Sequence, residues 1–132
     1  MKKEFSKHWK SSKQPRKQRK YLANAPLHIR KKFIGVNLSK ELRKTHDRRS
    51  IPVKKGDVVK ILRGKFKGKQ GKVIEVKLKI SKISVEGIQV KKLDNSKANI
   101  KLQPSNLQII ELNTEDKKRL KQKSKVKEEV KK

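Results

Sequence analysis

The chain has 132 residues, of which 31% are hydrophobic and 40% are charged, and its formal net charge at pH 7 is +29. This length suits one domain of ordinary size with extensions, and so large a charge opposes compaction unless a polyanion neutralises it. The sequence holds no cysteine, which excludes disulfide frameworks and thiolate metal sites, and no apolar run approaches the ~20 residues of a membrane-spanning helix.

Positive charge runs along the whole chain instead of being confined to one tail. Residues 1–50, 51–113 and 114–132 carry net charges of +14, +10 and +5. Nucleic acids and anionic membrane surfaces are the polyanions that would neutralise such a chain, and a pI near 10.6 is typical of nucleic-acid binding. No apolar stretch follows the basic N-terminus, so it does not resemble a secretory signal. We expect a cytosolic protein; a mitochondrial transit peptide is the alternative, against which Glu4 argues.

Residues 1–50 form a basic N-terminal extension in which two short helices are expected. The opening MKKEFSKHWKSSKQPRKQRKY has no sustained helical or strand period, and we expect it to stay disordered until it binds a partner. Pro26 suits the first position of one helix. Ser39 can cap a second helix over LSKELRKTH, with Glu41 in the first turn, where the helix dipole favours a carboxylate.

Residues 51–113 predict a small β domain. Apolar residues become dense and β-branched in DVVKIL, GKVIEVKLKI, ISVEGIQVK, ANIKLQ and LQIIEL, and several alternate with polar residues. Turn signals occur at 54–57, 63–71, 86–87, 93–97 and 103–106. Five or six short strands at this spacing predict an all-β barrel or sandwich. A domain of ~60 residues buries only about 60% of its unfolded surface, so we expect it to draw part of its stability from a partner.

Residues 114–132 form a lysine-rich C-terminal segment that is either a solvated helix or a tail. Thr114 can cap a helix whose first turn holds Glu115 and Asp116 and whose later residues are lysines, in agreement with the helix dipole. Apolar residues are sparse in this segment, so we expect it to fray. Neither an internal repeat nor a second domain is apparent.

A basic, glycine-rich loop, RGKFKGKQGK at residues 63–72, is the strongest functional signal. It does not fit the phosphate-binding loop of nucleotide hydrolases, which requires Gly, four residues, and then Gly-Lys-Ser/Thr at the start of a helix. The residues after Gly71 are strand-like instead, and the dinucleotide-binding pattern fails for the same reason. Nucleotide hydrolysis is therefore not expected, and the sequence offers no ligand set for Mg²⁺.

The loop is better interpreted as a connection between two strands that faces a nucleic-acid backbone. Its glycines would let the main chain approach phosphates and adopt left-handed conformations, while Lys65, Lys67, Lys69 and Lys72 would contact them. Phe66 would stack on a base or fill a hydrophobic gap. The alternative is a plain hairpin loop with solvated lysines, which the charge of the surrounding chain makes less favoured.

Histidines and carboxylates give weak signals for catalysis or metal binding. The histidines lie in separate basic stretches without carboxylate or cysteine partners at ligand spacing, so neither a metal site nor a catalytic base is expected. The carboxylates in the β domain lie among lysines, which favours ion pairing over acid–base catalysis. We therefore expect no cofactor and no enzymatic activity. The residues concerned are His8, His28, His46, Asp57, Glu75 and Glu86.

Two aromatic residues lie within the basic N-terminal extension, where no core is expected. Trp9 and Tyr21 would either stack on unpaired bases, as aromatics interleaved with basic residues do, or cover the β domain as satellite hydrophobic residues. The sequence does not favour one role over the other.

RNA contacts are predicted from three groups of residues: the N-terminal extension, the start of the β domain, and the glycine-rich loop. The predicted contact residues are Lys13, Arg16, Lys17, Arg19, Lys20, Arg30, Lys31, Lys32, Arg48, Arg49, Lys54, Lys55, Arg63, Gly64, Lys65, Phe66, Lys67, Gly68, Lys69, Gly71 and Lys72.

A family resemblance rests on these same segments. VKKGDVVKILRGKFKGKQGKVIEVKLK (53–79) resembles a KOW motif, with Gly71 as its central glycine, a motif shared by ribosomal proteins and NusG-type transcription factors. The flanks QPRKQRKYLANAPLHIRKKF, LSKELRKTHDRRSIPVKKGD, VEGIQVKK and PSNLQIIELN narrow the resemblance to the archaeal and eukaryotic branch of ribosomal protein L24, called L26 in eukaryotes. The match covers about residues 10–120.

The resemblance implies a small SH3-like β-barrel with basic extensions, acting as a structural component of the large ribosomal subunit. It further implies binding to the 5′ region of the large-subunit rRNA early in assembly, a final position near the exit of the nascent-peptide tunnel, and contacts with neighbouring ribosomal proteins and with nascent-chain or targeting factors. One departure lies in the later hairpin, where LDNSK places Asn95 at a position often held by glycine. Asparagine tolerates a left-handed turn, so the hairpin is expected to form.

Two other classes of nucleic-acid-binding protein share some of these features. A KOW-domain transcription-elongation factor would usually add a separate N-terminal α/β domain, and no βαβ pattern precedes Ile51. A general DNA-compacting protein would use the same charge on duplex DNA. An enzyme is the least expected class, because no nucleophile–base pair is visible.

Overall fold

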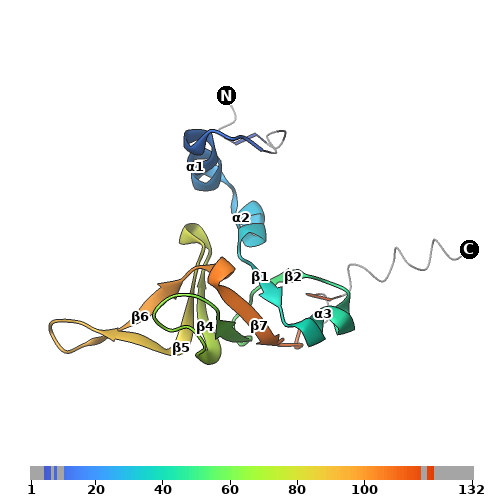
Figure 1. Ribbon diagram of the computed structural model, residues 1–132. Coiled ribbons are helices and arrows are strands. Elements are labelled where there is room, and N and C mark those ends of the chain that lie inside the picture. The colour runs from blue at the N-terminus through green and yellow to red at the C-terminus, as the bar shows by residue number, and fades with distance from the viewer. Residues whose placement is uncertain (1–4, 7, 9–10, 117–118, 121–132) are drawn as a thin grey trace, which may run out of the picture.

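The computed structural model describes residues 5–6, 8, 11–116 and 119–120. Within these residues a seven-stranded sheet curls into a half barrel, and two helices extend from it as an arm (Figure 1). No helix in this part of the chain is long and apolar enough to cross a membrane. The elements in chain order are α1 (Pro15–Asn24), α2 (Leu27–Phe33), β1 (Gly35–Leu38), α3 (Lys40–His46), β2 (Ser50–Pro52), β3 (Val58–Ile61), β4 (Gln70–Lys77), the 3₁₀ helix η1 (Leu78–Ile80), β5 (Lys82–Lys91), β6 (Lys97–Leu102), the 3₁₀ helix η2 (Pro104–Asn106) and β7 (Leu107–Glu111).

The strands follow the order β2-β1-β7-β3-β4-β5-β6 across the sheet. Neighbouring strands are antiparallel except β1 and β7, which run parallel and pair Leu38 with Ile109. Strands β3 to β7 correspond to the five apolar stretches identified in the sequence. The mainly β fold and the small SH3-like barrel are thereby confirmed.

The core lies inside the curl of the sheet. Alternating residues of β3 and β7 point inward, and the register pairs Val59 with Ile109 and Ile61 with Leu107, so these four side chains meet on one face. All four are at most 1% exposed. The apolar residues whose alternation predicted these two strands are therefore the residues that fill the core.

Strand β1 corrects the prediction that strands begin only at residue 51. Gly35–Leu38 lies between α2 and α3 and buries Val36 and Leu38 completely. A strand of four residues between two helices carries too short a pattern to be recognised locally, and its partner β7 lies about 70 residues further along the chain. Together with β2, which begins at Ser50, β1 starts the sheet before the boundary drawn from the sequence.

The turn predicted at residues 86–87 is wrong, because these residues lie within β5 and do not separate two strands. The pairing of β5 with β6 shifts register between Ser84 and Gln89, and Gly87 adopts a left-handed φ of 72°. The strand pairing is therefore irregular here, where β5 has more residues than the facing part of β6, and the strand continues through the irregularity without ending. Beyond the irregularity, β5 leaves the barrel and forms with β6 the long hairpin that projects from it (Figure 1).

The tip of this hairpin confirms the prediction made for its asparagine. Asn95 adopts a left-handed φ of 63°, and the turn is closed by Asp94, whose Oδ1 accepts hydrogen bonds from Ser96 N at 3.0 Å and from Ser96 Oγ at 2.7 Å. These bonds stabilise the ionised carboxylate, and they lower the pKa of Asp94.

The helices agree with the sequence at α2 and α3 and differ from it at α1. Ser39 caps α3, its Oγ accepting a hydrogen bond from Leu42 N at 3.3 Å, and Pro26 is the N-cap of α2 instead of its first helical residue. Helix α1 occupies a stretch for which the sequence predicted no regular structure. It buries none of its own residues. The ring centroid of its Tyr21 lies 4.8 Å from that of Phe5 and 6.0 Å from that of Phe33.

The described part of the C-terminal segment does not begin a helix at Thr114. Asn113 forms a side-chain turn instead, its Oδ1 accepting a hydrogen bond from Glu115 N at 3.0 Å. The rest of the predicted helix or tail, at 117–118 and 121–132, lies outside the described residues.

A buried ion pair fastens this segment to the barrel. The guanidinium of Arg119 donates to both carboxylate oxygens of Asp57, at 2.7 and 2.6 Å, and the two side chains are 4% and 0% exposed. Asp57 also accepts from Lys54 N at 2.8 Å and Asn113 N at 3.0 Å. Arg119 further donates to the carbonyls of Asn113 and Pro52, each at 3.1 Å. The pair thus joins the C-terminal segment to the turn that precedes β3.

Replacing Arg119 should lower the stability of the protein much more than replacing a surface cation. Arg119→Met leaves the buried Asp57 carboxylate without its charge partner, which should lower the free energy of unfolding by about 3–5 kcal/mol. Lys54→Met removes a half-exposed ion pair with Asp116 and should cost less than about 1 kcal/mol. Urea unfolding followed by circular dichroism compares them; equal losses would show that the buried pair has no special role.

Candidate nucleic-acid interface

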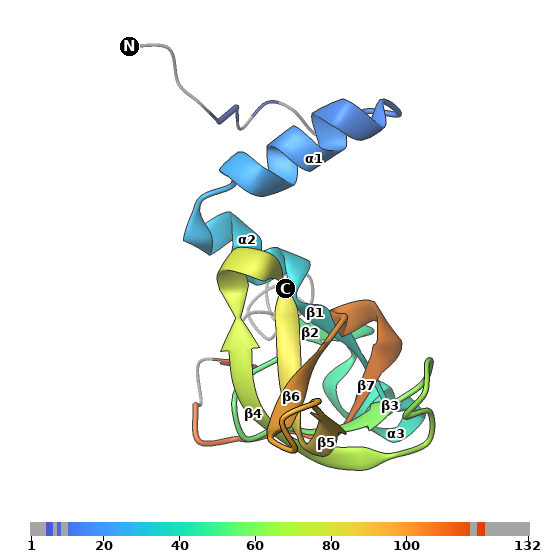
Figure 2. The ribbon, with the colours of Figure 1, turned by 90° about the vertical axis from the view of Figure 1, so that its left-hand side faces the viewer.

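The arm carries the first group of predicted contact residues. Helix α1 lies away from the barrel, joined to it through α2 (Figure 2). The basic side chains of this group are exposed, apart from Arg30, and so stand free to meet a phosphate backbone. The exposed members are Lys13, Arg16, Lys17, Arg19, Lys20, Lys31 and Lys32.

Arg30 is engaged inside the protein. Its Nε donates to Ala25 O at 2.7 Å, and its terminal nitrogens donate to Ala23 O and Lys79 O. The first two carbonyls lie at the junction of α1 and α2, and the third lies in η1 on the barrel. Arg30 was predicted to contact RNA; the structure places it where it fixes the direction of the arm.

Between α2 and β2 lies a cationic groove with a volume of about 490 Å³. Five lysines and arginines line it, including members of the arm group and of the group at the start of the β domain, which are up to 23 positions apart in sequence. The lining consists of His28, Lys31, Lys32, Arg48, Ser50, Ile51, Pro52, Lys54, Asp116 and Arg119. Folding thus brings two predicted groups together into one surface.

Two cations of the groove also hold the C-terminal segment. Arg48 donates to Arg119 O at 3.4 Å and to Leu120 O at 3.3 Å, and Lys54 pairs with Asp116. Their neighbours Arg49 and Lys55 are exposed. The start of the β domain therefore contributes both free cations and cations that are partly occupied.

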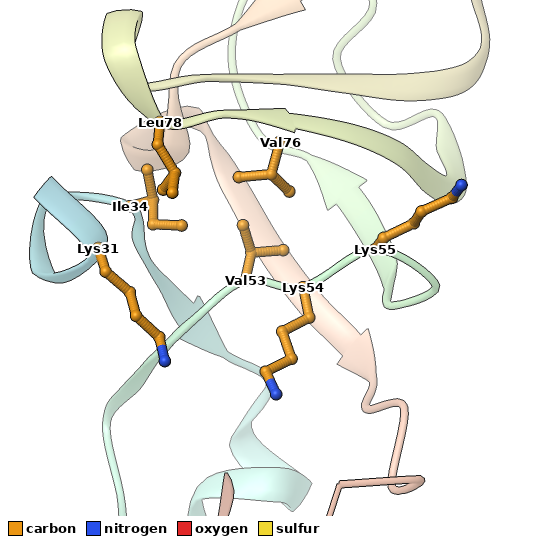
Figure 3. Close-up of a pocket in the computed structure, with 7 residues that line it drawn as sticks. All are labelled: Lys31, Ile34, Val53, Lys54, Lys55, Val76 and Leu78. Carbon is orange, nitrogen blue, oxygen red and sulfur yellow. The ribbon is translucent and has the colours of Figure 1, made fainter. Parts of the chain in front are cut away.

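An apolar pocket with a basic rim adjoins the groove. Ile34, Val53, Val76 and Leu78 come from the end of α2, the segment before β3, the end of β4 and η1, and their side chains converge (Figure 3). Lys31, Lys54 and Lys55 complete the lining of this hollow of about 410 Å³. No pattern in the sequence indicated this pocket, because its walls come from four separate segments.

The glycine-rich loop connects β3 to β4 as predicted. Gly68 N donates to Ile61 O at 2.8 Å and Ile61 N to Lys69 O at 2.9 Å, which closes its base. Gly64 and Gly68 adopt left-handed φ angles of 93° and 88°, with open space where a Cβ would lie. These two glycines are needed for the shape of the loop. The basic side chains at 63, 65, 67, 69 and 72 are exposed around it.

Phe66 fills a hydrophobic gap, which was one of the two roles predicted for it. Its partly buried ring packs against the core, and Lys69 Nζ lies 5.5 Å from the ring centroid, within cation–π range. Phe66 therefore anchors the middle of the loop to the barrel, which holds the lysines on either side of it in place.

Gly71 has a packing role that its place in the motif did not reveal. A Cβ at this position would lie 2.7 Å from Glu86 O and 2.8 Å from Val85 Cγ1. Strand β5 therefore crosses β4 too closely for any side chain at this point. This close approach explains why position 71 is glycine, while the RNA contact predicted for Gly71 stays a prediction.

The remaining sequence candidates show no arrangement for catalysis. Asp57 forms the buried pair with Arg119, and Glu75 pairs with Lys77 at 3.2 Å, so the expected preference for ion pairing is confirmed at both. Tyr21 packs within the arm, and Trp9 lies outside the described residues. Among the residues that the structure describes, no three His, Cys, Asp or Glu side chains gather as a metal site would require.

The structure thus defines a small curled β-barrel of the SH3-like class, whose loop, groove and arm present basic side chains. A comparison with protein families finds that the model for eukaryotic L26 and archaeal L24 ribosomal proteins matches residues 12–125. The chain belongs to this family. It is therefore a structural, non-catalytic protein of the large ribosomal subunit, associated with rRNA and with other ribosomal proteins.

The packing role of Gly71 is tested by adding one methyl group. Gly71→Ala should lower the free energy of unfolding by about 1–3 kcal/mol, because the extra methyl group overpacks the crossing of two strands. Gly35→Ala is the control, since its Cβ would meet only Lys32 O at an ordinary 3.6 Å, and it should change stability by less than about 0.5 kcal/mol. If Gly71→Ala and the original protein have the same free energy of unfolding in urea, the close approach of the two strands does not require glycine at position 71.

Proposed function

We propose that this protein binds the 5′ region of the large-subunit rRNA early in assembly of the subunit. The carrying observation is that three groups of cations are held on one small barrel: the exposed lysines of the loop, the groove between α2 and β2, and the arm. Between RNA helices that would otherwise repel one another, these cations neutralise phosphates and fix the distance between the helices.

The predicted division of the chain at residues 50 and 113 enters the proposal as a division of tasks, with β1 (Gly35–Leu38) assigned to the barrel. The barrel supplies a rigid platform and the loop, while the basic extension and the lysine-rich C-terminal segment reach along neighbouring RNA. In the mature cytoplasmic ribosome the protein would lie near the exit of the nascent-peptide tunnel, beside other ribosomal proteins and within reach of nascent-chain or targeting factors. The family resemblance supports this location.

The loop lysines should carry phosphate contacts and contribute little to the fold. Among the described residues, no ion pair engages Lys65, Lys67 or Lys69. Replacing all three with alanine should weaken binding to an rRNA fragment from the 5′ region. It should also reduce the slope of log affinity against log salt by about 2–3, as expected for three lost phosphate contacts. The original protein should show a steep slope in the same titration.

A matched control removes the same charge elsewhere. Alanine at Lys91, Lys92 and Lys97, which are exposed on the β5–β6 hairpin, leaves the loop intact while lowering the net charge equally. Equal losses of affinity in the two triple variants would mean that only total charge matters. A large loss of stability in the loop variant would assign these lysines to the fold.

A further inference from the structure

The apolar pocket and the cationic groove are two parts of one surface. Both hollows include Lys31 and Lys54, so they meet along these two side chains. In Figure 3 the amines of Lys31 and Lys54 point the same way, away from the converging side chains of Val53 and Leu78. An apolar floor therefore passes directly into a basic rim.

This combination restricts the chemistry of a ligand. The four apolar walls provide no hydrogen-bonding side chain, so the part of the ligand that enters must be apolar or flat. The rim and groove together hold six lysines and arginines, and Asp116 is the one carboxylate among the described residues that line them. A ligand that suits both parts has an apolar body attached to closely spaced anionic groups, which is the chemistry of a nucleotide within a nucleic-acid strand.

We propose that an unstacked base of an RNA strand enters the hollow over Ile34 and Val53, which form its floor at 2% exposure each, and packs against the partly exposed Val76 and Leu78. The flanking phosphates then lie along the groove against Lys31, Lys32 and Lys54. This inference rests on the proposed function, since it assumes that the protein binds RNA. A volume of about 410 Å³ falls within the range of small-ligand sites. Because the walls lack polar groups that would distinguish one base from another, the pocket selects an unpaired base of any identity.

Binding of a phosphate at Lys54 requires the ion pair between Lys54 and Asp116 to break. Lys54 pairs with Asp116 in the free chain, and the two side chains are 36% and 43% exposed. A pair this exposed is weak, so a phosphate can take the place of the Asp116 carboxylate at Lys54. The C-terminal segment stays attached during this exchange, because Arg119 holds it independently through Asp57.

Methyl-detected NMR of the full chain with a short oligouridylate as probe tests the proposal. The bases of oligouridylate stack weakly on one another and are free to enter a pocket. Ring currents of an inserted base should shift methyl signals of Ile34, Val53, Val76 and Leu78 upfield. The methyl groups of Leu93, fully exposed at the hairpin tip, are the internal reference and should not move.

A blocking variant provides the second measurement. Val76→Phe should fill the pocket and lower the affinity for oligouridylate about fivefold or more, the low end of what one base held by side-chain contact contributes. Val90→Phe is the matched control, because Val90 is 44% exposed on β5 outside the pocket, and it should leave the affinity unchanged.

The outcomes separate the pocket from the proposed function. Upfield methyl shifts together with a loss of affinity confined to Val76→Phe would support base insertion. Binding that leaves the pocket methyls unmoved and is equal in the two variants would overturn the pocket and leave RNA binding through phosphates intact. If the protein bound neither oligouridylate nor the rRNA fragment at low salt, the pocket and the proposed function would both be overturned.

Discussion

The structure depends on one constraint: a small apolar core must hold together a chain with a net charge of +29. The fold meets it by placing apolar residues inside a curled sheet and leaving its lysines at the surface. One arginine is nonetheless buried, and burial of a single ion costs several kcal/mol unless it is paired and hydrogen-bonded. Arg119 meets this condition through its two terminal nitrogens, which donate to Asp57 and to two carbonyl groups, while its buried Nε has no hydrogen-bond partner.

Arginine and lysine have different tasks in this molecule. Several arginines fasten the backbone: Arg30 joins the arm to η1, Arg43 donates to Leu38 O at 2.9 Å, and Arg48 and Arg119 hold the C-terminal segment. A guanidinium suits this task because its planar fork offers five donors in fixed directions. The lysines of the loop and arm project into solvent instead, where a compact, mobile charge can meet phosphates at varied positions. Four of the arginines therefore help to build the scaffold, while Arg16, Arg19, Arg49 and Arg63 are exposed with the loop and arm lysines.

Local patterns in the sequence predicted the features that depend on neighbouring residues. The alternation of apolar residues gave β3 and β7, Ser39 gave the start of α3, and the turn at Asn95 followed from its tolerance of a left-handed conformation. The loop at 63–72 was identified because its glycines and lysines are contiguous. Each of these features depends on residues that are close together in the sequence, so a local pattern is enough to predict it.

What the sequence could not predict depends on contacts between distant segments. Strand β1 is specified by pairing with β7, α1 by aromatic contacts with Phe5 and Phe33, and the Asp57–Arg119 pair by a chain reversal over 62 residues. Each of Arg30, Phe66 and Gly71 is of a residue type that also occurs at RNA contacts, and only the surrounding atoms reveal its internal role. The groove and pocket were missed for the same reason, since their walls come from separate segments.

The central claim is that unneutralised surface cations, and not a shortage of internal contacts, limit the stability of the free protein. The most direct test is the urea midpoint of the full chain measured at increasing sodium chloride concentrations. At 0.1 M, salt largely screens repulsion between exposed charges that lie more than about 10 Å apart, and it affects buried pairs much less. The account predicts that the midpoint rises steadily with salt. A midpoint that falls would show that attractive surface ion pairs dominate, and it would contradict the account.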